Sequence, residues 1–200
     1  MTRVKSGRHY DSRGRRDRAL LTQAAVVETA RQAFLESGYA GTTVSTIAER
    51  AGVSVETIYK TFGGKPGLVR AIHDRGLAGS QPTHAEDRSD LLSSGEVDPR
   101  VIVRGWGKLA AEVSPRVSPI LLLVRSAAAT DPELATLLEE IDERRLMRMR
   151  QNARVLARRG FLRDGMSAER AADILWMHTA PELYDLLVVR RGWTPKRFGE

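Results

Sequence analysis

The sequence predicts an all-α protein with a small N-terminal helix-turn-helix domain and a larger C-terminal helical domain. Apolar residues recur at helical spacing along most of the chain. Helix starts carry Ser, Thr or Asp caps, several of them followed directly by proline, which is favoured at the first helical position. The net charge of +7 is also unevenly placed, because residues 1–80 hold 13 Lys/Arg against 7 Asp/Glu. This asymmetry is typical of a nucleic-acid-binding N-terminal domain.

The stretch from Thr42 to Leu68 predicts two short helices joined by a tight turn and followed by a third. Thr43 and Ser54 are good N-caps for the first two helices. Gly52 suits the turn between them, because it adopts the left-handed conformation without steric cost. Small Ala48 lets the helices approach, and branched Ile58 fills the angle between them. An ordinary corner between two helices would show the same three residues.

Two further features favour DNA binding over that corner. The outward side of the second helix carries Thr57, Tyr59 and Lys60, whose side chains suit phosphates and base edges. Lys65 then precedes Pro66 at the start of the third helix, where the positive end of the helix dipole helps it to bind a phosphate.

Several motifs in the right order and spacing give the chain its resemblance to a known family. They are Phe34, Gly38, Thr42-Thr43, Ile47-Ala48, Ala51-Gly52-Val53-Ser54 and the run Tyr59-x-x-Phe62-x-x-Lys65-x-x-Leu68. Residues 22–75 resemble the DNA-binding domain of tetracycline-repressor (TetR-like) regulators. The resemblance implies an all-α homodimer, in which the N-terminal three-helix helix-turn-helix domain is followed by a larger helical ligand-binding and dimerisation domain.

On a pseudo-palindromic double-stranded operator, the resemblance implies that Thr43, Tyr59 and Lys65 contact phosphates. Ser54 and Thr57 are further phosphate candidates because they lie at the start of the recognition helix. The expected base readers are Val55 through a thymine methyl, Glu56 through cytosine N4 and Lys60 through guanine O6 and N7. Glu56 departs from a plainly basic face, since a carboxylate repels phosphates.

The domain boundaries follow from composition. Residues 1–20 are rich in arginine with little to bury, and they predict a disordered basic arm that either keeps the protein in solution or follows the DNA backbone. Residues 21–76 form the helix-turn-helix domain, its first helix running from about Leu21 or Thr22 to Ser37. The polar residues 77–98 predict a linker with one short helical turn. Residues 99–200 form the C-terminal domain.

Prolines and caps divide that C-terminal domain into helices. Ser114-Pro115 predicts a stop and Ser118-Pro119 a new start, followed by a long helix from Asp131-Pro132 to Arg159. By resemblance, the late helices within 173–195 form a four-helix bundle across the dimer two-fold.

A small, largely apolar ligand is expected among these helices, and a plain core would use the same residue types. The candidate ligand-binding residues are Trp106, Leu109, Leu122, Arg125, Trp176, His178 and Tyr184. For Arg125, a charge near the end of a helix in a structural ion pair is the favoured alternative. For His178, a hydrogen-bonded histidine of the core is the favoured alternative.

Other classes of protein are disfavoured by what the sequence lacks. There is no cysteine, no apolar run near the roughly 20 residues of a membrane span, and no apolar secretory segment, so a cytoplasmic location is expected. No nucleophile–base pair, metal cluster or phosphate loop indicates an enzyme, and no cofactor is expected. The remaining alternative is an architectural or chromosome-associated DNA-binding protein without a ligand.

Overall fold

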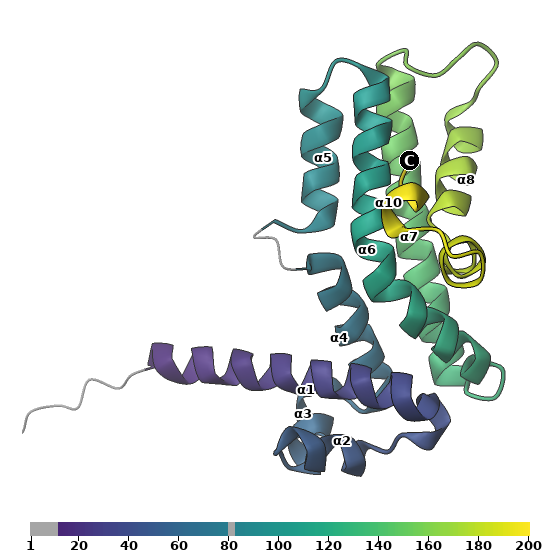
Figure 1. Cartoon of the computed structure of the whole chain (residues 1–200). Coiled ribbons are helices and arrows are strands. Elements are labelled where there is room, and N and C mark those ends of the chain that lie inside the picture. Colours follow the sequence, from purple (N-terminus) through teal and green to yellow (C-terminus); the bar gives the residue numbers. More distant parts are fainter. Residues whose placement is uncertain (1–11, 80–82) are drawn as a thin grey trace, which may run out of the picture.

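The N-terminal helices lie across the base of an otherwise upright helical bundle (Figure 1). The structure is a computed structural model that describes residues 12–79 and 83–200, and within those ranges all regular elements are helical. The first four are α1 (Ser12–Gly41), α2 (Val44–Ala51), α3 (Val55–Phe62) and α4 (Lys65–Ala78). The expected caps are confirmed, since Thr43 and Ser54 each accept a hydrogen bond from a first-turn N–H.

The C-terminal part stands above these helices, with α8 and the last helices on the side away from α5 (Figure 1). Here α8 packs on α7, while α9 and α10 pack on α6. The elements are α5 (Ala85–Gly95), α6 (Pro99–Ala128), α7 (Pro132–Arg158), α8 (Ala168–His178), α9 (Pro181–Tyr184), the π-helix η1 (Asp185–Arg190) and α10 (Pro195–Phe198).

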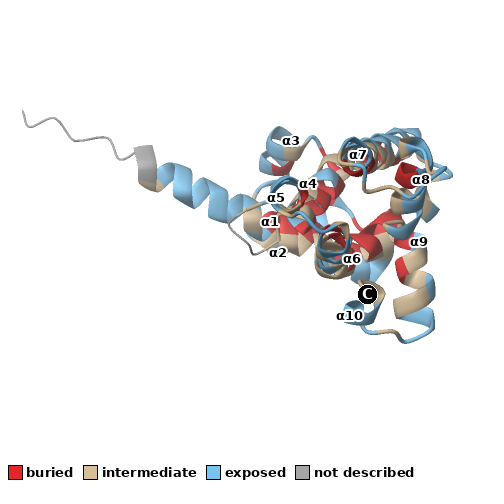
Figure 2. Ribbon diagram, turned by 90° about the horizontal axis from the view of Figure 1, so that it is seen from above, coloured by how far each residue is buried: buried red, intermediate tan, exposed pale blue. Residues whose placement is uncertain are grey.

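One apolar core runs through both parts of the molecule. It joins residues of α1 to α4, such as Phe34, Ile58 and Ile72, to residues of α6 and α7, such as Ile120 and Leu134. In the view from above, buried segments of α4 and α6 lie toward the middle of the molecule, with exposed residues around them (Figure 2). The packing of α6 on α1 and α4, and of α7 on α4, connects the C-terminal helices to the helix-turn-helix domain.

The first helix is longer than the sequence predicted, so the expectation of a disordered arm over residues 1–20 was wrong for residues 12–20. These residues form the start of α1. The prediction rested on their lack of buried apolar surface, but Ala, Leu and Arg are strong helix formers. Adding turns to an existing helix also avoids the cost of nucleation. Residues 1–11, which complete the predicted arm, lie outside the described residues.

The predicted linker also contains more structure than a single helical turn, because α5 occupies residues 85–95. Its buried face consists of Ala85, Ser89 and Ser93, spaced four residues apart. The Ser89 hydroxyl donates to the Asn152 side-chain oxygen at 3.3 Å, and Ser93 donates to the Ser89 carbonyl. A helix that packs through small polar residues carries no apolar stripe, so hydropathy alone did not predict it.

The two helices predicted on either side of residues 115–118 are one helix, α6, with Pro115 and Pro119 inside it. Each proline removes one backbone donor and ordinarily breaks a helix. The residues between and after them, Val117, Ser118 and Ile120, are buried in the shared core. Tertiary packing thus overrides the local preference. None of the helices described in residues 12–79 and 83–200 has the length and apolarity of a membrane span.

Candidate nucleic-acid interface

The turn between α2 and α3 has the geometry of a helix-turn-helix. Gly52 adopts a left-handed conformation with φ 67°, and its N–H donates to the Glu49 carbonyl at 3.2 Å. The Val53 N–H donates to the Ala48 carbonyl at 3.0 Å, which closes the end of α2. Ile58 of α3 is fully buried beneath the turn. The buried Ile58 side chain therefore fixes the orientation of α3 relative to the core.

With Ile58 buried, the other side of α3 faces solvent. Glu56, Thr57, Tyr59 and Lys60 are exposed. Val55 is 39% exposed, so its methyl groups remain accessible for a base contact. The structure thus brings the predicted phosphate and base contacts of α3 together on one accessible surface.

The helix starts present two matched hydroxyl pairs. Thr43 Oγ1 accepts the Thr46 N–H at 3.0 Å and lies 2.9 Å from the Thr46 hydroxyl. Ser54 Oγ accepts the Thr57 N–H at 3.1 Å and lies 2.8 Å from the Thr57 hydroxyl. Each pair has two hydroxyl protons and uses one internally, so the other can be donated to a phosphate. Sequence reasoning missed Thr46, although the Thr-x-x-Thr spacing after a cap signals this arrangement.

Lys65 does not project freely into solvent. Its ammonium donates to the Tyr39 carbonyl at 2.5 Å and lies 4.0 Å from the centre of the Tyr39 ring. Burial lowers the pKa of Lys65 and raises the pKa of Tyr39 to about 12. The ammonium has three donors, so phosphate contact requires either a free N–H here or a turn of the side chain away from Tyr39. In the neighbouring turn, Gly64 has a positive φ of 118°, and a Cβ at this position would lie 3.4 Å from the Tyr59 ring.

The candidate ligand residues do not form one cluster. Trp106 and Leu109 belong to an apolar group with Ile102 and Leu156. Tyr184 is buried and meets Phe198 edge-to-face, with ring centres 5.5 Å apart.

The remaining candidates are less deeply placed. Leu122 is half-buried, and His178 is exposed with Nδ1 at 2.8 Å from the Ile174 carbonyl. Two surface hollows of about 540 and 410 Å³ are lined by other residues, the second by Phe62, Pro66 and Arg70 on one side and Glu133 and Leu137 of α7 on the other.

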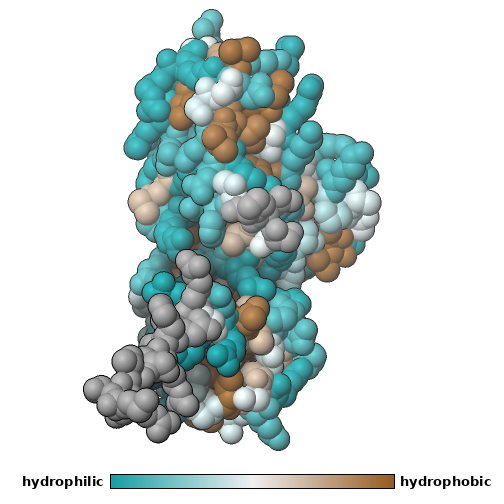
Figure 3. All heavy atoms as spheres, turned by 90° about the vertical axis from the view of Figure 1, so that its left-hand side faces the viewer, coloured by the Kyte–Doolittle hydropathy of each residue, from teal (hydrophilic) through white to brown (hydrophobic). Residues whose placement is uncertain are grey.

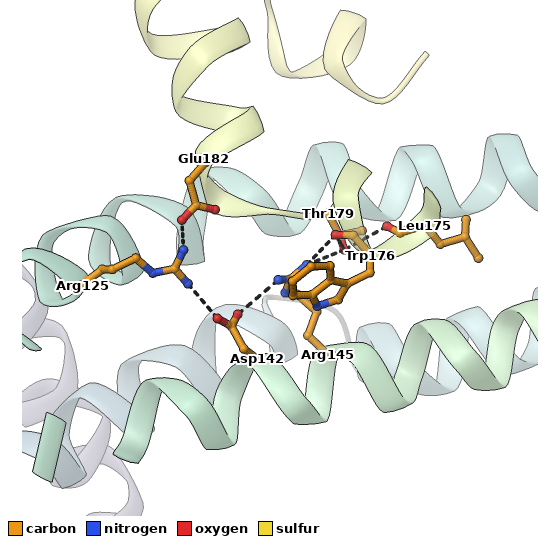
Figure 4. Close-up of polar contacts among 7 residues, drawn as sticks. All are labelled: Arg125, Asp142, Arg145, Leu175, Trp176, Thr179 and Glu182. Carbon is orange, nitrogen blue, oxygen red and sulfur yellow. Dashed lines mark hydrogen bonds and ion pairs between the residues drawn. The ribbon is translucent and has the colours of Figure 1, made fainter. Parts of the chain in front are cut away.

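Arg125 lies in a polar network rather than beside an open space (Figure 4). Its guanidinium pairs with Asp142 of α7 at 2.9 Å and with Glu182 of α9. Asp142 also accepts from Arg145 at 3.1 Å. This arrangement fits the structural alternative for Arg125.

Arg145 is a residue that the sequence analysis did not single out. It donates to the Trp176 carbonyl at 2.6 Å and to the Thr179 hydroxyl at 3.2 Å, while its guanidinium lies over the Trp176 ring (Figure 4). Burial lowers the pKa of Arg145. The signal in the sequence was its spacing of three residues from Asp142, which is typical of an ion pair within a helix. Together these contacts fix the end of α8 against α7.

Comparison with protein families places the helix-turn-helix in a known group. Residues 26–72 match the model of the bacterial regulatory proteins, tetR family. Over 84 residues the chain is 38% identical to the HTH-type transcriptional regulator TtgR of Pseudomonas putida, a match that spans 42% of this chain and 38% of TtgR. A second relative, the uncharacterized HTH-type regulator YvkB of Bacillus subtilis, is 34% identical over 77 residues and is covered over 36% of its length. These matches therefore span little more than a third of the relatives' length.

Similarity in fold extends over nearly the whole chain. A structure of a SmeT–triclosan complex superposes with a TM-score of 0.70 at 22% identity, covering 90% of this chain and 86% of that one. NalD, the secondary repressor of the MexAB-OprM multidrug efflux pump in Pseudomonas aeruginosa, gives a TM-score of 0.67 at 21% identity, covering 90% and 92% of the two chains. The C-terminal helices thus share the architecture of these proteins.

Proposed function

We propose that this chain, whose DNA-binding domain is that of the TetR family of transcriptional regulators, is a homodimeric repressor that a small, largely apolar ligand releases from a pseudo-palindromic operator. The observation that carries the DNA-binding part is the exposed face of α3, fixed by the buried Ile58. A short helix that is anchored in the core on one side and carries polar side chains on its exposed side is suited to binding in the major groove.

Within this proposal, the residues divide into positioning and reading groups. Thr43, Ser54, Thr57, Tyr59 and Lys65 bind phosphates and set the register of the domain. Val55, Glu56 and Lys60 contact base edges. The hydroxyl pairs at the starts of α2 and α3 support the first assignment, because each retains a donor for an acceptor outside the protein.

The dimer is proposed to form through α8 and the segment from α9 to η1. Large apolar side chains remain exposed there, among them Met177 (53%), Leu186 (50%) and Val189 (63%). Burying such side chains against a second copy is favourable, by roughly 1.5–3 kcal/mol for each one fully removed from water. The two-fold axis would then hold two α3 helices for two half-sites.

The ligand is proposed to bind between α6, α7 and α8. Trp106 Nε1 and Trp176 Nε1 are buried and lack a hydrogen-bond partner among the described residues. A buried donor without a partner costs about 1–3 kcal/mol. A mostly apolar molecule with one or two acceptor atoms would satisfy these indoles. Triclosan, the compound in the SmeT complex, is a reasonable first probe.

Release follows if the ligand favours a conformer whose α3 helices no longer match successive major grooves. The Arg116 Nε–H donates to the Gly76 carbonyl at 2.8 Å, which ties α6 to the end of α4. Arg70 and Arg144 add ion pairs between α4 and α7. Through these contacts, a shift of α6 or α7 would displace α4 and with it the helix-turn-helix domain.

The test is the reciprocity of the two binding events. By linkage, operator must weaken ligand binding by the same factor as ligand weakens operator binding. The measurement is a titration of triclosan and related aromatic compounds into free and operator-bound protein. A compound that binds with the same affinity in both states would leave the switch without a basis. An architectural protein would instead occupy many genomic sites with similar affinity.

A further inference from the structure

The start of α1 stands clear of the rest of the protein. Figures 1 and 2 both show it projecting away from the body, and residues 15–23 are all exposed. At 1.5 Å per residue, the twelve residues 12–23 extend about 18 Å. We call residues 12–23 the α1 extension. Its residues 15–23 present an exposed helical surface.

The charge of the α1 extension is strongly positive. Its sequence contains four arginines and one acidic residue, Asp17. The N-terminal end of a helix carries a further partial positive charge. Arg18 donates its Nε–H to the Gly14 carbonyl at 3.0 Å, within the helix. A polyanion is the partner that this surface fits.

Two of the arginines continue the stripe by which α1 packs on the protein. Arg15 and Arg16 precede Ala33 and Phe34 by 18 residues, which is five turns, so each lies on the same side of the helix as its counterpart. Ala33 and Phe34 are almost completely buried in the core. The same side of α1 is therefore apolar and buried at Ala33 and Phe34, and basic and exposed at Arg15 and Arg16.

The direction of the α1 extension determines which DNA it can reach. In both views it points away from α8, and α9 also lies on the opposite side (Figures 1 and 2). If two subunits associate through α8 and α9, both extensions project outward from the two-fold axis. They would then lie beside DNA outside the half-sites, and not between them.

We infer that the α1 extension is a second DNA-binding surface, which contacts the phosphates of the duplex flanking each half-site. This inference rests on the proposed function, because it takes the dimer and the operator as given. An 18 Å rod spans about five base pairs at 3.4 Å each. The contact is to the backbone, so flanking length matters and flanking sequence does not.

The experiment compares operators of two lengths. One fragment ends at the outer edges of the half-sites, and the other adds ten base pairs of arbitrary sequence on each side. Affinities of the full chain and of the triple variant Arg15→Ala, Arg16→Ala, Arg18→Ala are measured over a range of salt concentrations. Arg154→Ala, Arg158→Ala, Arg163→Ala is the matched control, since it removes the same charge from exposed positions in and beyond the C-terminal half of α7.

For the full chain and the control, the longer fragment should bind about tenfold more tightly or better at low salt. The triple variant should lose this gain, and the slope of log K against log salt on the long fragment should fall by roughly 2–4 per dimer. Binding of all three proteins to the short fragment should agree within about twofold.

Each other outcome overturns the inference. Equal affinity of the full chain for both fragments, or overlapping salt plots for full chain and triple variant, would show that the extension does not touch DNA. A change in oligomeric mass on Leu20→Ser, Leu21→Ser would make it a protein–protein contact. Failure of the full chain to prefer the short operator over unrelated DNA would instead overturn the proposed function, so the two failures are distinguishable.

Discussion

Arg70 of α4 pairs with Glu140 of α7 at 2.6 Å, directly across the junction between the DNA-binding and C-terminal helices. Both side chains are about half exposed, and exposed ion pairs contribute only about 0–1 kcal/mol. A double-mutant cycle with Arg70→Ala and Glu140→Ala should therefore give a coupling energy below about 1 kcal/mol in chemical unfolding. Glu139→Ala is the control, since this neighbouring carboxylate is exposed. A coupling energy of several kcal/mol would contradict this prediction and would make the Arg70–Glu140 pair a major contribution to stability.

Phosphate contacts and base contacts should respond differently to substitution. Tyr59→Phe and Lys65→Ala should weaken binding to operator and to unrelated DNA by similar factors. Lys60→Ala should instead relax the preference at one base-pair position, at a cost of about 1–3 kcal/mol there. Lys108→Ala, an exposed lysine on α6, controls for the loss of charge. Equal losses on every sequence for Lys60→Ala would remove Lys60 from the reading group.

A charge in the proposed dimer interface should separate the subunits. Leu186→Asp would bury an unpaired carboxylate between two copies, which is strongly unfavourable. Sedimentation should show a monomer, and operator binding should be lost because two half-sites are no longer held together. A charge at the neighbouring Leu187 should act in the same way.

Exposed apolar side chains also occur on other surfaces. Brown patches lie at the top of the face in Figure 3, and Leu91 of α5 is 66% exposed. Leu91→Asp is therefore the matched control and should remain dimeric. A dimeric Leu186→Asp, or a monomeric Leu91→Asp, would place the interface elsewhere.

Acid should remove one identifiable contribution to stability. Glu112 of α6 accepts from Arg88 of α5 at 2.8 Å and pairs with Arg116 at 3.1 Å. The hydrogen bond from Arg88 holds the pKa of Glu112 below its ordinary value of 4.5. A lowered pKa in the folded state stabilises the protein above the unfolded-state pKa, and this contribution is lost as pH falls through the folded-state pKa.

The wild type should thus exceed Glu112→Gln in free energy of unfolding at pH 7, by about 1–2 kcal/mol. The difference should shrink as the pH is lowered below 4.5. Urea unfolding of both proteins across this range measures it. A difference that stays constant down to acid would exclude the ion pairs of Glu112 as its source.

The helix-turn-helix could be predicted from sequence because its information is local. Caps at Thr43 and Ser54, the left-handed Gly52 and the buried Ile58 are each set by one or two turns of chain. Such signals survive without knowledge of the rest of the fold.

The features that sequence reasoning missed depend on distant partners. Ser89 can be buried because Asn152 lies opposite it, 63 residues away. Pro115 and Pro119 are tolerated in α6 because the core around Ile120 holds both flanks. Lys65 meets the ring and carbonyl of Tyr39, which no spacing rule predicts. The candidate ligand-binding residues do not form one cluster, and their role in ligand binding stays a prediction.

The most direct test of the central claim, sequence-specific binding by a dimer, is to sequence the DNA that the purified protein selects from random fragments. We expect one enriched pseudo-palindrome, whose half-sites are inverted and separated centre to centre by one helical turn of about 10–10.5 base pairs or by a multiple of it. Lys60→Ala should select the same spacing with one position relaxed in each half-site. Fragments without a shared motif, or a motif without two-fold symmetry, would contradict the account.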